Sequence, residues 1–349
     1  MIASLTRPVA VSEALREYLQ FHLGVGRLEY AVAPTPSSEG WETYIYQFQL
    51  RGDKDLPEDF KRPVILRVYA NINGLPRLQH ETAVQHHMHQ RGYPVAKPLL
   101  VEETDSLLGG PFMIMELLPG RTLLDELFRR FWRIVHAPVE MAEMQARLHR
   151  MPVDGFPAPA GDFLTRNLQE LRDLIEEYDQ DDLRPGLDWL QEHRPPAAAD
   201  SSILHLDFHP MNMLCRWRRC TGVLDWGDAD VGDRHADVAL SLMLMRSAPV
   251  GIGKNWWQKF NALPGRWIFW KYYLWAYRRR LPLDEQKLAY YMAWASLRRL
   301  CRRGMWFKSS PQIDGHKPSF LRYLAMERLD RLVEGFRRPS GIVLKGALS

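Results

Sequence analysis

Two short segments constrain this chain more than any other feature: His205-Leu206-Asp207-Phe208-His209-Pro210-Met211-Asn212 and Val223-Leu224-Asp225-Trp226. Pro210 interrupts regular structure, so the first segment is predicted to be a loop and residues 213–217, which follow it, a short strand. Residues 218–222 are predicted to turn the chain, and the second segment to form the returning strand. Such a hairpin brings Asp225 beside Asn212, where both side chains reach one cation.

This arrangement of carboxylates and an amide indicates phosphoryl transfer. Phosphoryl transfer passes through a loose transition state, so a protein must mainly orient the attacking hydroxyl and hold metal ions on the phosphates. Asp207 is predicted to be the base that accepts the hydroxyl proton, and His205 to orient its loop. Asn212 and Asp225 are predicted to bind the metal. Their oxygen atoms are hard ligands, which together with phosphates favour Mg²⁺.

These segments resemble the catalytic loop and metal-binding segment of the aminoglycoside phosphotransferase and choline kinase-like enzymes, which are small-molecule kinases with a protein-kinase-like fold. The resemblance covers most of the chain. It implies ATP as the donor and a small-molecule hydroxyl as the acceptor. The stretch from Gly232 to Ala239 is similar to the segment that follows in this family, which implies that Asp233 and Asp237 support the catalytic loop.

The fold that we expect is α+β and bilobal. Residues 1–117 should form a nucleotide-binding lobe with an antiparallel sheet, and residues 118–349 a mostly helical lobe that carries the catalytic and acceptor-binding residues. The hinge is expected at about 116–120. Hydrophobic periodicity predicts the individual elements. Strands are expected at 28–34, 41–50, 63–69, 99–103 and 111–115, and helices from about residue 8 to 22 and at 75–91, 122–131, 142–149 and 164–178.

The strand at 63–69 and the helix at 75–91 supply a candidate phosphate contact. In the kinase arrangement a cation on this strand contacts the α- and β-phosphates and pairs with a Glu on the helix. Arg67 and Glu81 fit these two positions. The usual cation is Lys, and Arg has a wider, forked head. Many members of the small-molecule kinase family have Arg here, so the resemblance makes this a variation.

Two further segments are expected to bind the nucleotide. Residues 35–42 occupy the place of a phosphate-covering loop, where Ser37, Ser38 and Gly40 let backbone N–H groups and hydroxyls approach the phosphates. Residues 116–120 look like the hinge, and the backbone of Glu116 and Leu118 is expected to contact the adenine edge.

Composition bounds the remaining possibilities. A chain of 349 residues, 46% of them hydrophobic, is long enough for two lobes, and its three cysteines form no disulfide or metal-binding pattern. No segment has the length and apolar character of a membrane span, so a cytoplasmic location is expected. The oligomeric state is left open, as is the identity of the acceptor.

Charge is distributed unevenly along the chain. Residues 154–200 contain twelve acidic residues and four Arg, whereas residues 254–308 contain thirteen Lys and Arg but only Asp284 and Glu285. By resemblance the basic segment walls the acceptor site, which favours a neutral or anionic acceptor over a polycation. Two rival hypotheses remain: a nucleotide-binding pseudokinase or scaffold, motivated by Arg67 and the glycine-poor loop, and a surface for polyanions or membranes over 266–303. Nucleic acid is not an expected partner.

Overall fold

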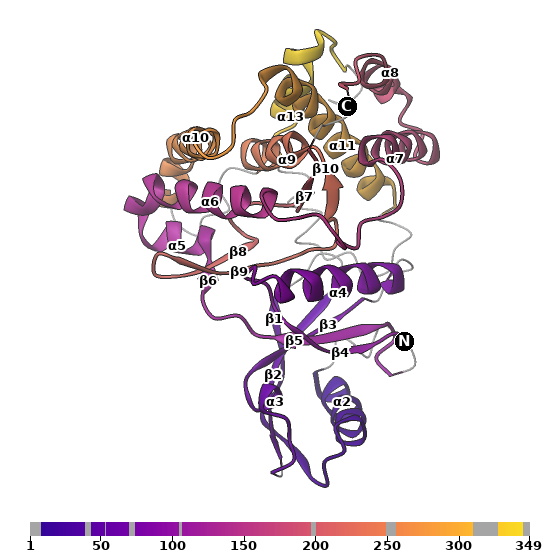
Figure 1. The fold of residues 1–349 in the computed structure, drawn as a ribbon, viewed down its shortest axis with the longest axis vertical. Helices are drawn as coiled ribbons and strands as arrows, with labels where there is room; N and C mark the ends of the chain where they lie inside the picture. The colour runs from indigo at the N-terminus through magenta and orange to yellow at the C-terminus, as the bar shows by residue number, and fades with distance from the viewer. Residues whose placement is uncertain are drawn as a thin grey trace. The chain divides into compact units, whose positions relative to one another are not determined.

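The structure is a computed structural model that describes residues 8–38, 43–52, 54–69, 74–104, 107–196, 200–248, 256–309 and 327–344. The chain divides into two compact units. The first contains the residues up to Pro119 and also Thr221–Gly227, and the second contains Gly120–Cys220 and most of the chain from Asp228 onward. Figure 1 shows strands concentrated in the first unit and helices in the second, which confirms the α+β, kinase-like fold class.

A five-stranded antiparallel sheet forms the first unit, in the order β1-β2-β3-β5-β4. The strands are β1 (Leu28–Ser38), β2 (Tyr44–Gly52), β3 (Val64–Val68), β4 (Pro98–Glu102) and β5 (Phe112–Glu116). The helices are α2 (Pro8–His22), α3 (Glu58–Lys61) and α4 (Gly74–Gln90). Strand β3 is central and buried along its whole length, so a residue on it is held between neighbours on both sides.

Two apolar clusters give this sheet its two faces. The larger includes Leu15 and Leu19 of α2 with Phe48 and Leu66 of the sheet, and α2 packs against β1. Side chains alternate between faces along a strand, so the next residue after Leu66, Arg67, points the other way. The smaller cluster, which includes Ile65, Leu78 and Met113, lies on that second face with α4.

The second unit is mostly helical. Its strands are β6 (Arg121–Thr122), β7 (Ser202–Leu204), β8 (Met213–Arg216), β9 (Arg219–Val223) and β10 (Asp230–Gly232). Its helices are α5 (Leu123–Arg129), η1 (Phe131–Val135), α6 (Ala137–His149), α7 (Phe163–Glu177), η2 (Asp181–Leu183), α8 (Arg184–Glu192), α9 (Arg234–Ser247), α10 (Trp256–Arg278), α11 (Glu285–Ser309) and α13 (Leu329–Ser340). Strand β9 carries the chain back into the first unit.

Helix α9 lies at the centre of the second unit. It contacts α10, α11 and α13, and most of its residues are buried, as expected for a helix that is covered on nearly all sides. Helix α6 packs between α10 and β7. Two short antiparallel strands, β7 and β10, pair with Leu204 opposite Asp230. This ladder ends where the loop that contains Asp207 begins.

The predicted strands and helices are confirmed at nearly all positions, with two corrections. The returning strand is β9, Arg219–Val223, and not 223–226. Trp217 has a left-handed φ of +61°, which permits a tight turn directly after β8. The chain therefore turns back earlier in the sequence than predicted. Asp225 also has a left-handed φ, +62°, and lies beyond the strand. The polar character of residues 218–222 suggested a turn where the chain is already extended.

Residues 35–38, which were expected to lie in a loop, are extended strand. Strand β1 continues through Ser38, with Thr35 opposite Gln47 and Ser38 opposite Ile45 in the ladder with β2. Irregular register along this ladder accommodates Pro34 and Pro36, which have no N–H group to donate to a neighbouring strand. Gly40 lies outside the described residues, and so do the side chains of Ser37 and Ser38.

In the part of the chain that the structure describes, no helix combines the length and the apolar character that crossing a bilayer requires.

Substitution of Gly232 tests the packing beside the β7–β10 ladder. A Cβ atom at Gly232 would lie 2.9 Å from Cβ and 2.8 Å from Cγ of the buried Phe163, at the start of α7. We expect Gly232→Ala to destabilise the protein by about 1–3 kcal/mol, the usual cost of overpacking. At Gly265, in α10, the nearest atom would be Cδ1 of Ile134 at 3.7 Å. Gly265→Ala should therefore stabilise by about 0.5–1 kcal/mol.

The measurement is urea unfolding of both variants and of Gly232→Ala combined with Phe163→Leu. The smaller side chain should recover part of the loss. If Gly232→Ala unfolds at the wild-type urea concentration, the packing of α7 on β10 is not as described.

Candidate active site

Arg67 is the centre of a buried ion-pair network in the first unit. Its Nη1 donates to Oε1 of Glu81 at 2.5 Å, and its Nη2 donates to Oδ1 of Asp225 at 3.1 Å. Its Nε donates to Oγ1 of Thr43 at 3.2 Å. Burial alone would lower the pKa of Arg67, but the charge of Glu81, followed by Tyr69 and Asp225, outweighs burial and raises it. The guanidinium is therefore a permanent cation that binds two carboxylates.

Glu81 is fully buried, and its two oxygen atoms accept three hydrogen bonds from side chains. Besides Arg67, Tyr69 donates its hydroxyl to Oε2 at 2.7 Å, and Gln85, one turn further along α4, donates Nε2 to Oε1 at 3.1 Å. Burial raises the pKa of Tyr69 well above its ordinary value, so the phenol remains a donor. These bonds hold the carboxylate in one orientation toward Arg67.

Asp225 is held in place by the residues around it in the first unit. Trp226 is buried, donates Nε1 to the carbonyl oxygen of Val223 at 3.0 Å, and meets Tyr93 edge-on at 5.6 Å between ring centroids. Val223 donates its backbone N–H to the carbonyl of Pro94 at 2.8 Å. The carboxylate side chain itself stays 36% exposed, so it remains open to a ligand.

A second arginine, Arg77 of α4, lies near Asp225, with 3.8 Å between its Nη2 and Oδ1 of Asp225. A Cβ atom at Gly227 would lie 2.8 Å from Nε of Arg77, so the glycine allows this close approach. The sequence analysis missed Arg77. Arg77 lies four residues before Glu81, which places both side chains on one face of the helix, and this spacing could have identified Arg77 from the sequence.

The catalytic loop in the second unit is anchored by the buried carboxylate of Asp237. Its Oδ1 accepts the backbone N–H of Leu206 at 2.7 Å, and its Oδ2 accepts that of His205 at 3.2 Å. Leu206 has a left-handed φ of +59°, an unfavourable conformation for this residue that the two bonds support. The role that resemblance implied for Asp237 is therefore matched by direct contacts.

Two side chains of α6 complete the environment of Asp237. Gln145 donates Nε2 to Oδ2 at 3.0 Å, and Nε2 of His149 lies 2.9 Å from the same oxygen. Burial raises the pKa of Asp237, but the bond and charge of His149, with His205 and Gln145, outweigh it and lower the pKa overall. The sequence analysis gave Gln145 and His149 no role. Their four-residue spacing on a predicted helix was the only signal.

Asp207 and Asn212 are joined across the catalytic loop. Nδ2 of Asn212 donates to Oδ2 of Asp207 at 2.6 Å and to its backbone carbonyl at 3.0 Å. The amide oxygen of Asn212 takes part in neither bond. His205 accepts the backbone N–H of Asp207 at its Nδ1, at 3.2 Å, and so fixes the start of the loop from within the core.

The other oxygen of Asp207 faces an imidazole. Oδ1 lies 3.4 Å from Nε2 of His209, and the Asp207 side chain is 33% exposed. His209 also accepts the backbone N–H of Met211 at Nδ1, at 3.2 Å, which orients the ring. The sequence analysis assigned no role to His209, although it lies in the loop.

Glu116 and Leu118 stand at the end of β5 in the first unit. Glu116 donates its backbone N–H to the carbonyl of Lys97 at 3.0 Å. Leu118 packs on the smaller apolar cluster with Met115, and a Cβ atom at Gly222 would lie 2.3 Å from its Cδ1. The predicted hinge residues therefore lie next to an apolar surface of a kind that suits an aromatic base.

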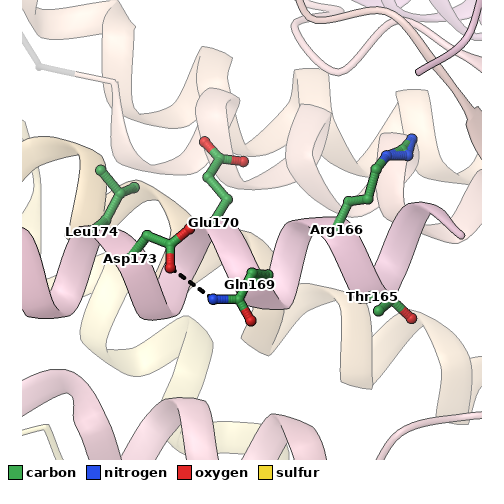
Figure 2. Close-up of a pocket in the computed structure, with 6 residues that line it drawn as sticks. All are labelled: Thr165, Arg166, Gln169, Glu170, Asp173 and Leu174. Carbon is green, nitrogen blue, oxygen red and sulfur yellow. Dashed lines mark hydrogen bonds between the residues drawn. The ribbon is translucent and has the colours of Figure 1, made fainter. Parts of the chain in front are cut away.

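Helix α7 lines a cavity of about 540 Å³ in the second unit, and Figure 2 shows its residues: Thr165, Arg166, Gln169, Glu170, Asp173 and Leu174. Arg166 donates to both oxygen atoms of Asp230, at 2.6 and 2.8 Å. Since Asp230 pairs with Leu204, this cavity adjoins the strand that leads into the catalytic loop. Sequence analysis did not predict a cavity here.

Arginines of α11 reach the same region. Arg298 and Arg302 donate to Oδ2 of Asp228 at 3.1 and 2.9 Å. Arg302 also donates to Oε1 of Glu170 at 2.9 Å. Three carboxylates near the cavity, those of Asp228, Asp230 and Glu170, are thus already bound by arginines.

The structure brings the predicted site residues together in two groups. Arg67, Glu81 and Asp225 meet in the first unit, and His205, Asp207 and Asn212 meet in the second.

Comparison with known proteins agrees with this architecture. The model of the family described as "Phosphotransferase enzyme family" matches residues 35–297. An aminoglycoside 3'-phosphotransferase of Streptomyces fradiae is 32% identical over 170 residues, which are 44% of this chain and 59% of that protein. Human acyl-CoA dehydrogenase family member 11 is 24% identical over 176 residues, 47% of this chain and 22% of that protein. The chain therefore spans only part of the length of these relatives.

Solved structures match over almost the whole chain. A putative aminoglycoside phosphotransferase from Ralstonia eutropha has a TM-score of 0.61 at 18% identity, covering 96% of this chain and 97% of that one. Amicoumacin kinase, solved with AMP-PNP and Ca²⁺, has a TM-score of 0.58 at 19% identity, covering 90% and 92%. At these identities the likeness concerns the fold. The family match spans most of the chain and confirms the resemblance drawn from the two motifs, so this chain belongs to the phosphotransferase enzyme family, with the fold of its small-molecule kinases.

Proposed function

We propose that this chain transfers the γ-phosphate of ATP to a hydroxyl group of a small molecule, with Asp207 as the base. The observation that carries the proposal is the geometry of the catalytic loop. Asn212 holds Asp207 at 2.6 Å, and the buried Asp237 holds the two residues before it by their backbone N–H groups. A base whose position is fixed in advance lowers the cost of orienting the hydroxyl.

The nucleotide is proposed to bind to the residues of the first lobe, which we assign to 1–117, the second lobe being 118–349. Arg67 contacts the phosphates while Glu81 holds its guanidinium. The backbone at Glu116 and Leu118 contacts the adenine edge. Ser37, Ser38 and Gly40 are proposed to cover the phosphates.

Asn212 and Asp225 are proposed to hold Mg²⁺. The amide oxygen of Asn212, which takes no part in the two bonds to Asp207, and the carboxylate of Asp225, which is 36% exposed, are hard oxygen ligands of the kind that Mg²⁺ prefers. The bound ion neutralises charge on the β- and γ-phosphates. Because Arg67 already donates to Asp225, the cation of the strand and the metal ligand are oriented by the same contact.

The proton of the acceptor hydroxyl passes to Asp207. Oδ2 is occupied by the amide of Asn212, so Oδ1, beside His209, is the oxygen proposed to receive it. Asn212 keeps the carboxylate from rotating during this step. The cavity along α7 is proposed to hold the rest of the acceptor.

Substitution of Asp207 tests the base. Asp207→Asn should reduce turnover by about 10²–10⁴-fold, the usual contribution of a general base, while MgATP affinity stays within a few-fold of wild type. Turnover is measured by ATP consumption and by mass detection of the phosphorylated acceptor. Asp200→Asn, at an exposed Asp a few residues earlier, is the matched control and should be fully active. Turnover above about a tenth of wild type in Asp207→Asn would contradict the role of Asp207 as the base.

A double-mutant cycle tests whether Arg67 and Glu81 act together. Arg67→Ala and Glu81→Ala should each weaken MgATP binding, and the double variant should lose much less than the sum, with a coupling energy of about 1–3 kcal/mol. Calorimetric titration provides the affinities, and Arg67→Lys tests the need for a forked cation. The control cycle uses the exposed pair Lys97–Asp59, which lies 2.7 Å apart. Its coupling in MgATP affinity should be zero, and additive losses at Arg67 and Glu81 would contradict the paired role.

The charges around the α7 cavity support a neutral or anionic acceptor. Arginines already bind Glu170, Asp228 and Asp230, so most of the negative charge near the cavity is paired with a cation. Asp173, which also lines the cavity, accepts the side-chain amide of Gln169 at 2.7 Å. In an ATP-consumption screen, neutral or carboxylated alcohols should therefore be phosphorylated with a kcat/KM at least about tenfold above that of kanamycin-like polyamines, a difference of about 1.4 kcal/mol. Saturable, efficient phosphorylation of the polyamine would overturn this preference and leave the phosphotransferase assignment intact.

A further inference from the structure

Helix α10 has an outer face that is both aromatic and basic. Trp267 and Trp275 are 58% and 52% exposed, and Tyr272 is 42% exposed. On the opposite side of the helix, Tyr273 and Tyr277 are completely buried. The helix packs on α6 and α9 through that buried side, and Figure 1 shows α10 at the edge of the second unit beside α6. Large exposed indoles at such spacing are uncommon on a surface without a partner.

Cations alternate with these rings at helical spacing. Lys271 Nζ lies 5.9 Å from the ring centroid of Trp267 and 4.6 Å from that of Trp270. Arg279 Cζ lies 5.2 Å from the ring centroid of Trp275. We name this surface the outer face of α10 and define it by Trp267, Lys271, Tyr272, Leu274, Trp275, Arg278 and Arg279.

The outer face has an excess of positive charge. Arg278 pairs with Glu285 at 2.6 Å. Within the described ranges, neither Lys271 nor Arg279 forms an ion pair with a carboxylate. A depression of about 320 Å³ is lined by five members of the face, Lys271, Leu274, Trp275, Arg278 and Arg279. It thus combines apolar contact area with three cationic groups in one place.

We propose that the outer face of α10 docks on the headgroup region of an anionic lipid bilayer. Indoles and phenols have an apolar body and a polar edge, and they are stabilised at the boundary between hydrocarbon and water. Lys and Arg beside them attract anionic phospholipid, and each contributes about 1 kcal/mol near such a surface, roughly a fivefold gain in affinity. Peripheral docking through one face of a helix requires no membrane span.

Two other occupants fit the face less well. In a twofold dimer formed through this face, two copies of the same basic surface would meet, so Lys271 and Arg279 would lie against a surface of like charge. Single-stranded nucleic acid binds by stacking bases on aromatic rings. Here Lys271 and Arg279 each lie over one face of Trp267 and Trp275, so at most one face of each ring can stack on a base.

Vesicle flotation of the full chain tests the proposal. The protein should bind vesicles of phosphatidylcholine mixed with phosphatidylglycerol, bind pure phosphatidylcholine far less, and dissociate as salt is raised. Lys271→Glu combined with Arg279→Glu should weaken binding by at least about 25-fold, the product of two fivefold losses. Trp267→Ala combined with Trp275→Ala should also release the protein, and tryptophan fluorescence should shift to shorter wavelength on binding only when these indoles are present.

The matched control reverses two exposed cations on other helices, Arg184→Glu with Arg337→Glu, and should leave most vesicle binding intact. Circular dichroism and melting temperature verify that each variant is folded. Equal binding to neutral vesicles, loss of binding in the control, or no effect of the α10 variants would overturn the proposal. Tighter binding of an oligothymidylate, or a dimer in solution that Trp267→Ala with Trp275→Ala dissociates, would assign the face to another partner. No outcome depends on phosphotransfer activity.

Discussion

A single buried carboxylate, Asp237, determines the shape of the catalytic loop. It accepts two backbone N–H groups from residues 205 and 206 and is bound by Gln145 and His149 on α6. A charged group without solvent is stable only when such bonds satisfy its lone pairs. These bonds fix the loop and α6 relative to α9, the helix on which Asp237 lies. The left-handed backbone at Leu206 persists because these contacts over-determine it.

Arg67 plays the corresponding part in the first unit. A guanidinium presents donors in a planar fork, so it can bind Glu81, Asp225 and Thr43 at the same time and still remain in one orientation. An ammonium group has one nitrogen and would have to share it. The substitution of Arg for the more usual Lys thus links the strand, α4 and the segment after β9 through one side chain.

Residues 254–308 are rich in Lys and Arg, and the fold directs some of these cations inward and others outward. Arg298 and Arg302 turn inward on α11 and bind Asp228 and Glu170 near the α7 cavity. Lys271 and Arg279 turn outward on α10 and lie over indoles. The helical period decides the direction, because positions three or four residues apart share a face and positions two residues apart point to different sides. Net charge along a segment cannot reveal this division.

The sequence by itself determined the family, the α+β fold class and nearly all strands and helices, and it predicted the residues that the structure brings together in each unit. These rest on local signals: a motif of fixed spacing, periodic apolar positions, and helix caps such as Thr122, whose Oγ1 accepts the N–H of Asp125 at 3.1 Å. Tertiary structure decided the strand ends, the position of a turn and the side-chain contacts between residues that are distant in sequence. It extended β1 through Ser38 because β2 supplies the pairing partner, and it moved the β8–β9 turn because Trp217 adopts a left-handed φ. It also brought Gln145 and His149 into contact with Asp237, and Arg77 close to Asp225. These contacts join residues that are far apart in sequence, so no local sequence pattern predicts them.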